Sequence, residues 1–382
     1  MPRATLVPIT PSVLEWAIEQ AGVEIEDLAK RSGAEPQQVA AWLAGDAQPS
    51  KTQFRKLVTF LKRPEAFFFL PRPPSREAVP AAFRHPPGGM REPTRIELEG
   101  IRKARRVQQV GRWVAERVED DRWRENPIPA ANGKTPHEAA KAAKAWLGWS
   151  LQDQRQASSS AAVVRAIRER LEERGVLTLQ LPLGSDGGRG FSLYDRDKPV
   201  VAINTHYNYE ARLFSYIHEL GHLMRRTDAI CIGFAATKAE RWCEAFAASF
   251  LIPIAALRDR VEFRLGEDAK VTEIDQLRPL AGDFRVSLSA MAIRLEELDF
   301  GRAGLFESIP TTSDFKRQGG GPGTDTTRGA VRLREFGEGY FGLILAGERA
   351  GALRRQDALR YLDVSEGQLR KLHNENVEPF EP

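Results

Sequence analysis

The sequence predicts a multidomain α+β protein, with an all-helical module at the N-terminus, a small sheet in the middle of the chain and helical segments after it. Its 382 residues are two to three times the length of an ordinary domain of about 150 residues, so we expect at least two cores. Strand-like apolar runs fall between residues 176 and 204, whereas helical spacing with glycine stops marks much of the rest. With 42% hydrophobic and 28% charged residues, most of the chain should fold.

Charge and cysteine content argue against several classes of protein. A net charge of +4 is too small over 42.7 kDa to predict a nucleic-acid coat or a membrane clamp. The two cysteines, Cys231 and Cys243, cannot form a disulfide framework. We find neither a signal-peptide pattern nor an apolar run of about 18 residues that could span a bilayer. We therefore expect a soluble, cytoplasmic protein without membrane contact.

Four short helices are expected in the N-terminal module, and glycines end the first three. These stops are Gly22, Gly33 and Gly45, and Pro36 suits the first turn of the third helix. The second, third and fourth helices should cover residues 24–32, 36–44 and 52–61. The pattern is that of a helix, a tight glycine turn and a second helix.

A stiff proline-containing linker over residues 71–94 should precede one long helix over residues 96–118. One side of this helix carries an apolar stripe of valines, and the other a basic stripe. The basic residues are Arg102, Arg105, Arg106 and Arg112. They could grip phosphate, although a solvated helix face is the commoner meaning of such a stripe.

Three strands and further helices should form the middle of the chain. The strands are expected at residues 176–181, 191–194 and 199–204, with the last two joined as a hairpin. The strand Val200–Asn204 is either an edge strand that could pair with an extended substrate or simply a core strand. Helices should follow around Leu213–Met224, at 237–251, in a second helix–turn–helix pattern at 279–298 and, after a flexible Gly319–Gly323 stretch, at about 336–373.

The chemistry of the chain centres on His218-Glu219-Leu220-Gly221-His222, a H-E-x-x-H run on an amphipathic helix. Residues four apart share a helix face, so both imidazoles can reach one divalent cation, for which zinc is the natural choice. The alternative is that these histidines merely pack or solvate a helix. Gly221 should cost about 1 kcal/mol relative to alanine inside a helix, which indicates that another group approaches the backbone there.

A catalytic zinc needs a third protein ligand, and the next helix offers Glu240 and Glu244, four residues apart. One could bind the metal and the other could hold an imidazole by its distal N–H, and spacing alone does not choose between them. Asp228 and Cys243 are weaker candidates. Two imidazoles and a carboxylate would also suit Mn²⁺ or Fe²⁺. Glu219 would take a proton from the attacking water and pass it to the leaving amine, which is peptide hydrolysis.

These segments resemble the ImmA/IrrE family of bacterial zinc endopeptidases. The similar residues are Ile203-Asn204, Arg212–Ser215, His218–His222, Glu240, Glu244, Phe246–Ala248 and Leu251–Pro253. The resemblance implies a minimal zincin (gluzincin-like) domain in which His218, His222 and Glu240 bind the metal and Glu219 is the general base. It gives Glu244 the role of supporting an imidazole from outside, where the family more usually has an amide.

Residues 23–61 resemble the Cro/lambda-repressor-like (XRE) helix–turn–helix modules that are often fused to this peptidase. The resemblance implies a recognition helix at 36–44, which offers Gln37 and Gln38 for base edges but no Arg or Lys. Arg102, Arg105 and Arg106 of the basic stripe could grip phosphate beside this module. Residues 1–70 nevertheless contain eight basic and eight acidic residues, whereas DNA binding normally leaves a basic footprint. Residues 71–124 hold thirteen basic and eight acidic residues.

We expect five regions along the chain. They are a DNA-binding-like domain at 1–70, a linker and basic helix at 71–150, a zinc peptidase domain at 151–260, a helix–turn–helix-like segment at 261–310, and a flexible linker with a small helical domain at 311–382. The leading hypothesis is a regulatory endopeptidase whose substrate, by family resemblance, is a helix–turn–helix repressor or an antitoxin. The rival is a transcription regulator or antitoxin-like protein, binding DNA as a homodimer, whose metal site is structural or sensory.

Overall fold

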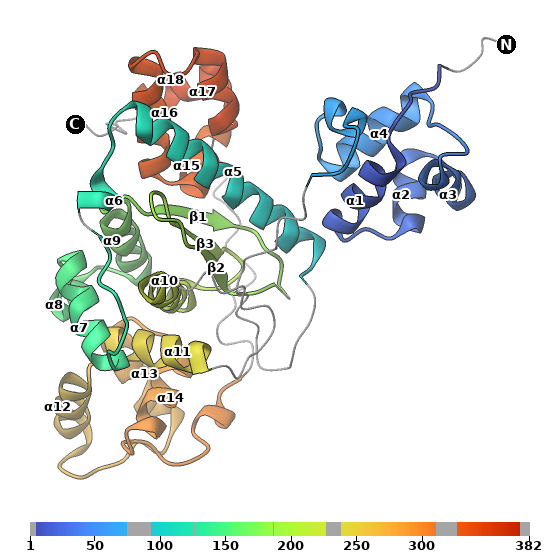
Figure 1. Cartoon of the computed structure of the whole chain (residues 1–382). Coiled ribbons are helices and arrows are strands. Elements are labelled where there is room, and N and C mark those ends of the chain that lie inside the picture. The colour runs from blue at the N-terminus through green and yellow to red at the C-terminus, as the bar shows by residue number, and fades with distance from the viewer. Residues whose placement is uncertain are drawn as a thin grey trace. The chain divides into compact units, whose positions relative to one another are not determined.

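The computed structural model describes residues 5–74, 93–125, 127–185, 187–226, 238–310 and 327–374 (Figure 1). The chain forms two compact units. One contains the described residues up to 102, and the other contains those from 103 onward. Helix α5 (Arg95–Arg117) begins in the first unit and continues in the second. Mostly helical structure with one three-stranded sheet confirms the predicted α+β class.

The first unit is helical, and its helix ends follow the predicted glycine stops. Its elements are α1 (Pro11–Ala21), α2 (Ile25–Ser32), α3 (Pro36–Ala44), α4 (Lys51–Leu61) and a short 3-10 helix, η1 (Glu65–Phe69). Gly22, Gly33 and Gly45 adopt positive φ, the left-handed conformation that ends a helix. Leu14, Leu28 and other apolar side chains of these helices form one buried core.

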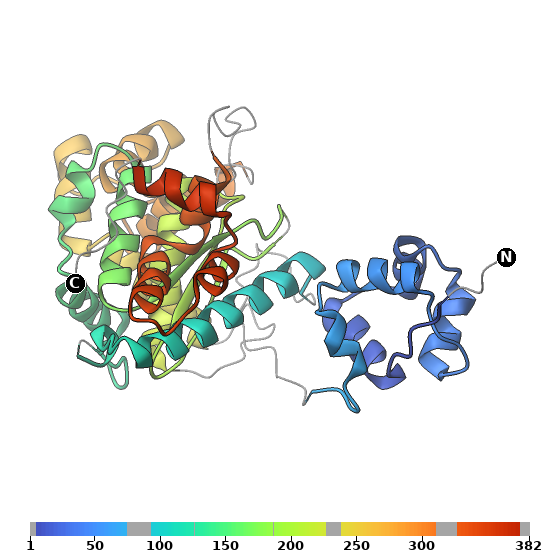
Figure 2. The same ribbon diagram turned by 90° about the horizontal axis from the view of Figure 1, so that it is seen from above.

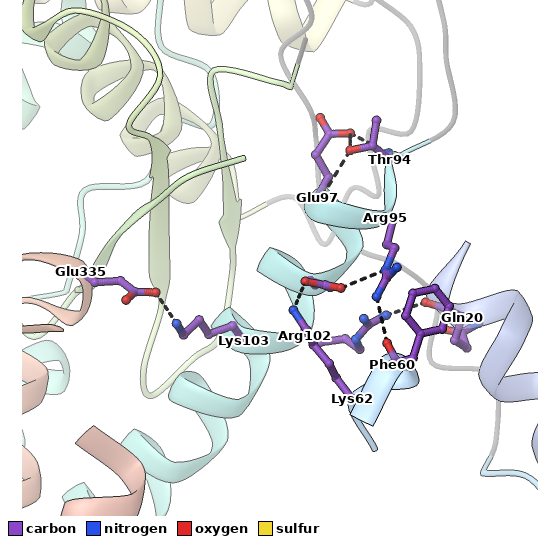
Figure 3. Close-up of polar contacts among 10 residues, drawn as sticks. Gln20, Phe60, Lys62, Thr94, Arg95, Glu97, Arg102, Lys103 and Glu335 are labelled. Carbon is purple, nitrogen blue, oxygen red and sulfur yellow. Dashed lines mark hydrogen bonds and ion pairs between the residues drawn. The ribbon is translucent and has the colours of Figure 1, made fainter. Parts of the chain in front are cut away.

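The start of α5 is fixed by a cap and by contacts within the first unit (Figure 3). The backbone N–H of Thr94 donates to the Glu97 carboxylate over 2.7 Å, which begins the helix. Arg95 donates to the carbonyl oxygen of Phe60 over 2.8 Å, and its guanidinium lies over the Phe60 ring. Arg102 donates to the Gln20 carbonyl over 2.6 Å. One member of the predicted basic stripe is therefore engaged in packing α5 against α1.

The sheet of the second unit has the order β1-β3-β2, so β3 is the central strand. β1 (Leu177–Leu181) is parallel to β3 (Val200–Asn204), and β2 (Gly190–Leu193) is antiparallel to it, with Leu193 opposite Val200. The expected hairpin is confirmed. The suggestion that Val200–Asn204 is an edge strand is wrong, because a strand from earlier in the chain pairs with its other side. All five of its residues are buried.

Helices cover both faces of the sheet. On one face lie α9 (Ser160–Glu173) and α10 (Tyr209–Arg225), and Gln180 of β1 donates to the Tyr216 hydroxyl of α10 over 3.3 Å. The second part of α5 and the C-terminal bundle cover the other face, where a Cβ on Gly111 would lie 2.7 Å from Leu177 Cδ1 (Figure 2). The bundle contains α15 (Arg328–Phe336), α16 (Glu338–Arg349), α17 (Arg355–Leu362) and α18 (Glu366–Asn374).

A buried carboxylate joins this bundle to α9. Glu172 accepts a hydrogen bond from the backbone N–H of Gly339, in the first turn of α16, over 2.7 Å. It also accepts from the Thr178 hydroxyl of β1 and from Arg168. The C-terminal helices thus lie in the same compact unit as the sheet, and the predicted single helical piece at 336–373 is instead three helices, with α15 before them.

The remaining helices surround α10 and complete the core of the second unit. They are α6 (Arg122–Glu125), α7 (Pro136–Leu147), α8 (Leu151–Gln156), α11 (Lys238–Leu251), α12 (Ile254–Leu265), α13 (Ile274–Phe284), α14 (Leu288–Glu297) and a 3-10 turn, η2 (Phe306–Ser308). Helix α7 was not predicted from the sequence. It begins with a capping box, a recognisable start signal in which Thr135 and Glu138 satisfy each other's backbone N–H groups. Its alanine face, with Ala139, Ala140 and Ala143 buried, packs against α11.

Several sequence-based expectations fall outside the described residues: most of the 71–94 linker, Asp228, Cys231 and the Gly319–Gly323 stretch. Among the residues that the structure does describe, no helix is both long enough and apolar enough to cross a membrane.

Candidate metal centre

Helix α10 presents both histidines of the H-E-x-x-H run on one face. The helix starts after Asn208, whose side-chain oxygen accepts a hydrogen bond from the Ala211 N–H over 2.9 Å. His218 and His222 follow one turn apart, and their Nε2 atoms lie 3.1 Å from each other. They are almost completely buried, with exposed fractions of 1% and 4%. This excludes the alternative that they are simply solvated.

Glu240, in the first turn of α11, brings a carboxylate to both imidazoles. Its Oε2 lies 3.2 Å from His218 Nε2, and its Oε1 lies 3.3 Å from His222 Nε2. In a tetrahedral zinc site with bonds of about 2.0 Å, neighbouring ligand atoms are about 3.3 Å apart. The three groups therefore have the spacing and the donor atoms of a site that can hold a metal ion. The same donors also suit Mn²⁺ and Fe²⁺.

The three groups also set one another's protonation. Burial opposes charge on Glu240, but hydrogen bonds with the two histidines outweigh it and hold the pKa of its carboxyl well below the usual value. Burial likewise opposes charge on His222, but its interactions with Cys243 and Glu240 raise its pKa above the usual value. Glu240 is therefore an anion over the whole neutral range, as a metal ligand must be.

Glu219 is held separately from the three ligand residues. Its side chain is buried, and the Ser192 hydroxyl of β2 donates to its Oε2 over 2.8 Å. β2 comes close because Gly190 has no side chain, and a Cβ there would lie 2.8 Å from the Ala202 carbonyl oxygen and 3.6 Å from Glu219 Cγ. Sequence reasoning missed Ser192, because only the strand register places it opposite helix α10.

Cys243, rather than Glu244, is the residue of α11 that faces His222. Its thiol is fully buried and hydrogen bonds with His222, and burial raises the pKa of the thiol. Glu244 is exposed and is not part of the three-residue group. Its expected support of an imidazole stays a prediction.

Gly221 explains how α10 and α11 come close enough for their side chains to share a metal. A Cβ at this position would lie 2.9 Å from Phe246 Cδ1 and 3.3 Å from Cys243 Sγ. The group that was expected to approach this glycine is therefore helix α11 itself.

Comparison with protein families gives one match. Residues 171–296 match the model of a peptidase family that is described as the IrrE N-terminal-like domain. The match runs from α9 to α14 and contains every member of the candidate metal centre. It supports the ImmA/IrrE peptidase family for this part of the chain. No curated protein and no solved structure matches the chain.

The residues expected to bind DNA lie outside the peptidase match, and several have other contacts. Gln37 is exposed on α3, but the side-chain oxygen of Gln38 accepts a hydrogen bond from the Glu35 N–H over 3.0 Å. Arg105 is half-buried, and Arg106 lies over the Tyr361 ring. Arg102 packs against α1, and Nη1 of Arg112 lies 3.4 Å from Oδ2 of Asp195. The stripe is therefore largely taken up by intramolecular contacts, and DNA binding by residues 1–70 stays a prediction.

Proposed function

We propose that the chain is a regulatory, zinc-dependent endopeptidase that hydrolyses a peptide bond in a protein substrate such as a helix–turn–helix repressor or an antitoxin. The observation that carries the proposal is the set of three ligand residues, whose nearest donor atoms are 3.1–3.3 Å apart in each pair, beside a carboxylate that is not one of them. A purely structural metal site would normally use a fourth protein ligand. Among the described residues, the group has three.

In this proposal His218, His222 and Glu240 hold the ion, which would supply Lewis-acid polarisation of the scissile carbonyl. Glu219 takes a proton from the attacking water and transfers it to the nitrogen of the leaving amine. The Ser192 hydroxyl, which donates to Oε2 of Glu219, holds this carboxylate in position. The low-dielectric surroundings strengthen each of these electrostatic interactions.

We assign the pairing of an extended substrate to β2. Among the described strands, β2 has a neighbour on one side only, and Ser192 ties it directly to the general base. An added substrate strand would donate and accept main-chain hydrogen bonds along this edge. The assignment replaces the central strand β3, which already has neighbours on both sides.

The test combines metal analysis with detection of new protein N-termini. The full-length protein, loaded with zinc, is added to an extract of the native host cells, and new N-termini are identified by mass spectrometry. The wild type should generate specific cleavages, and Glu219→Gln should keep its zinc and generate none. If Glu219→Gln retains zinc and yields the same cleavages, Glu219 is not the base. If the wild type binds zinc and cleaves nothing, the metal is structural or sensory, as the transcription-regulator hypothesis holds.

The ligand assignment is tested by comparing two glutamates one turn apart on α11. Glu240→Ala should lower the zinc content to well below one ion per chain, because two imidazoles alone bind zinc weakly. Glu244→Ala is the matched comparison, because spacing alone left Glu244 open as the third ligand and the structure leaves it exposed and outside the ligand group. Its zinc content should stay well above that of Glu240→Ala. Equal occupancy in wild type and Glu240→Ala would overturn the assignment.

A further inference from the structure

Five pairs of helices in the described residues share the same turn. They are α1–α2, α2–α3, α7–α8, α13–α14 and α17–α18. In each pair the first helix ends at a residue with left-handed backbone, which is followed by an apolar residue and then by the residue that caps the second helix. The five turns are Gly22-Val23-Glu24, Gly33-Ala34-Glu35, Gly148-Trp149-Ser150, Arg285-Val286-Ser287 and Asp363-Val364-Ser365.

The buried positions of four of these pairs also coincide. Five residues before the left-handed residue, the first helix has a buried apolar side chain, and six residues after it, the second helix has another. These residues are Ala17, Leu28, Leu280 and Ala358 in the first helices and Leu28, Val39, Met291 and Leu369 in the second. In α7–α8 the second of these positions holds the polar Gln154. Two helices joined by a short turn of this kind can place the second helix in the major groove of DNA.

The pairs differ in the charge of the second helix. α3 contains no lysine or arginine, and the one arginine of α14, Arg294, is buried and donates to the Ile252 carbonyl oxygen. In contrast, α18 has two adjacent basic residues on its surface. Arg370 has a side chain that is 71% exposed, and Lys371 is also exposed. The helix α2, which is second in the pair α1–α2, also has an exposed basic pair, Lys30 and Arg31, but Glu26 and Asp27 offset it. Among the described pairs, α17–α18 alone has a second helix with a net positive charge.

The start of the first helix shows the same contrast. In many such modules this helix crosses the phosphate backbone. The N-terminal pair has Glu24, Glu26 and Asp27 there, which would repel phosphate. The C-terminal pair has two exposed arginines, Arg354 and Arg355, at the corresponding place, followed by one acidic residue, Asp357. Over residues 327–374 there are nine basic and six acidic residues, whereas residues 1–70 have eight of each.

Ion pairs hold the C-terminal pair in one arrangement. Arg355, at the start of α17, donates twice over 2.9 Å to Glu366 of α18 and once over 2.7 Å to Glu348 of α16. Figure 1 shows α15 and α16 nearer to the sheet than α17 and α18. The surface of α18 is thus presented by an ordered bundle and does not need to refold for binding.

We propose that the C-terminal helix pair, α17–α18, binds duplex DNA, with α18 in the major groove and Arg370 and Lys371 as contacts to the phosphates. The proposal is independent of peptide hydrolysis, because none of these residues belongs to the metal centre. It also moves the DNA-binding role away from the N-terminal module, whose corresponding helix is uncharged.

Binding can be measured by fluorescence anisotropy with a labelled, mixed-sequence duplex of about 30 base pairs, long enough for nonspecific contacts. The full-length protein carries Glu219→Gln throughout, so that proteolysis plays no part. The double variant Arg370→Ala/Lys371→Ala should bind about ten-fold or more weakly, and the slope of log K against log salt should fall by about 1.8, the loss of two phosphate contacts. Lys30→Ala/Arg31→Ala, an exposed basic pair on α2, is the matched control and should bind as the parent does.

Gly367, the second residue of α18, provides a second test that removes no native side chain. Nothing lies within 4 Å of a Cβ built at this position, so any side chain fits without a clash. Gly367→Glu should weaken DNA binding and Gly367→Arg should tighten it, with equal circular dichroism spectra. The proposal is overturned if the parent does not bind the duplex, if the two Gly367 variants bind alike, or if the α2 variant loses at least as much affinity as the α18 variant.

Discussion

Replacing Gly221 by alanine should damage the metal centre although it adds only one methyl group. The new Cβ would lie 2.9 Å from Phe246 Cδ1 and 3.3 Å from Cys243 Sγ. The Phe246 ring is fully buried and stacks on Trp242 at a centroid distance of 5.5 Å, so it cannot swing away into solvent. Overpacking of this kind costs about 1–3 kcal/mol, from which about 1 kcal/mol is recovered because alanine is the better helix former.

The metal should respond more strongly than the stability. Separating α10 from α11 moves Glu240 away from the two imidazoles, whose present distances from it are 3.2 and 3.3 Å. Changes just outside a metal's ligands typically lower affinity about 10–100-fold, and we expect at least about ten-fold for Gly221→Ala. Competition with a chromogenic zinc chelator measures this affinity, and urea unfolding of the metal-free protein measures the stability.

Gly367→Ala is the control for this substitution. It makes the same change inside a helix but meets nothing within 4 Å, so it should raise stability by about 0.5–1 kcal/mol and leave zinc affinity unchanged. Should Gly221→Ala bind zinc as tightly as the wild type and gain stability like Gly367→Ala, the close approach of α11 at Gly221 would not be what sets the metal geometry.

Three further predictions follow from buried polar groups. Ser192→Ala should lower the cleavage rate about ten-fold, because Glu219 loses the hydrogen bond that positions it. Ser192→Thr, which keeps a hydroxyl, should restore part of the rate. Unchanged rates in both variants would refute the role of Ser192 in positioning Glu219. Asp120→Asn should lower the free energy of unfolding by about 3 kcal/mol in urea titrations. The reason is that Lys198, which is almost fully buried and lies 2.8 Å from Asp120, would lose its counter-charge. The double variant Asp120→Asn/Lys198→Met should recover most of this loss. Burial lowers the pKa of Lys144 from 10.5 to about 8, so its charge destabilises the fold below pH 8. The free energy of unfolding should therefore rise by up to about 3 kcal/mol as the pH increases from 8 to 10.5. Lys144→Met should abolish this rise.

Local features of the sequence were sufficient to predict many helix ends and the two histidines of the candidate metal centre. Glycine stops placed the ends of the first three helices because a left-handed residue is needed there and glycine adopts it at little cost. The histidines at 218 and 222 were predictable because a four-residue spacing fixes their common side within one helix. Spacing alone left Glu240 and Glu244 open as third ligand, and only the family resemblance favoured the first of them.

Features that depend on long-range packing were not predictable in this way. Ser192 has no local signal, because its contact with Glu219 depends on which residue of β2 lies beside α10. The central position of β3 likewise depends on its pairing with β1, which comes from an earlier part of the chain. Glu244 and Cys243 are neighbours in sequence, but the angle at which α11 crosses α10 turns the cysteine inward and leaves the glutamate exposed.

The two-sided covering of the sheet has a consequence for anyone who wishes to study the region of the family match in isolation. A fragment cut to the boundaries of the family match, 171–296, would lack both α5 and α16. Water would then reach Leu177, Leu179 and Leu181, which are now almost fully buried, at a cost of about 4–9 kcal/mol. That is comparable with the entire stability of a typical domain. Similarity therefore marks out the candidate metal centre, but autonomous folding requires helices that lie more than fifty residues before the match and more than forty residues after it in the chain.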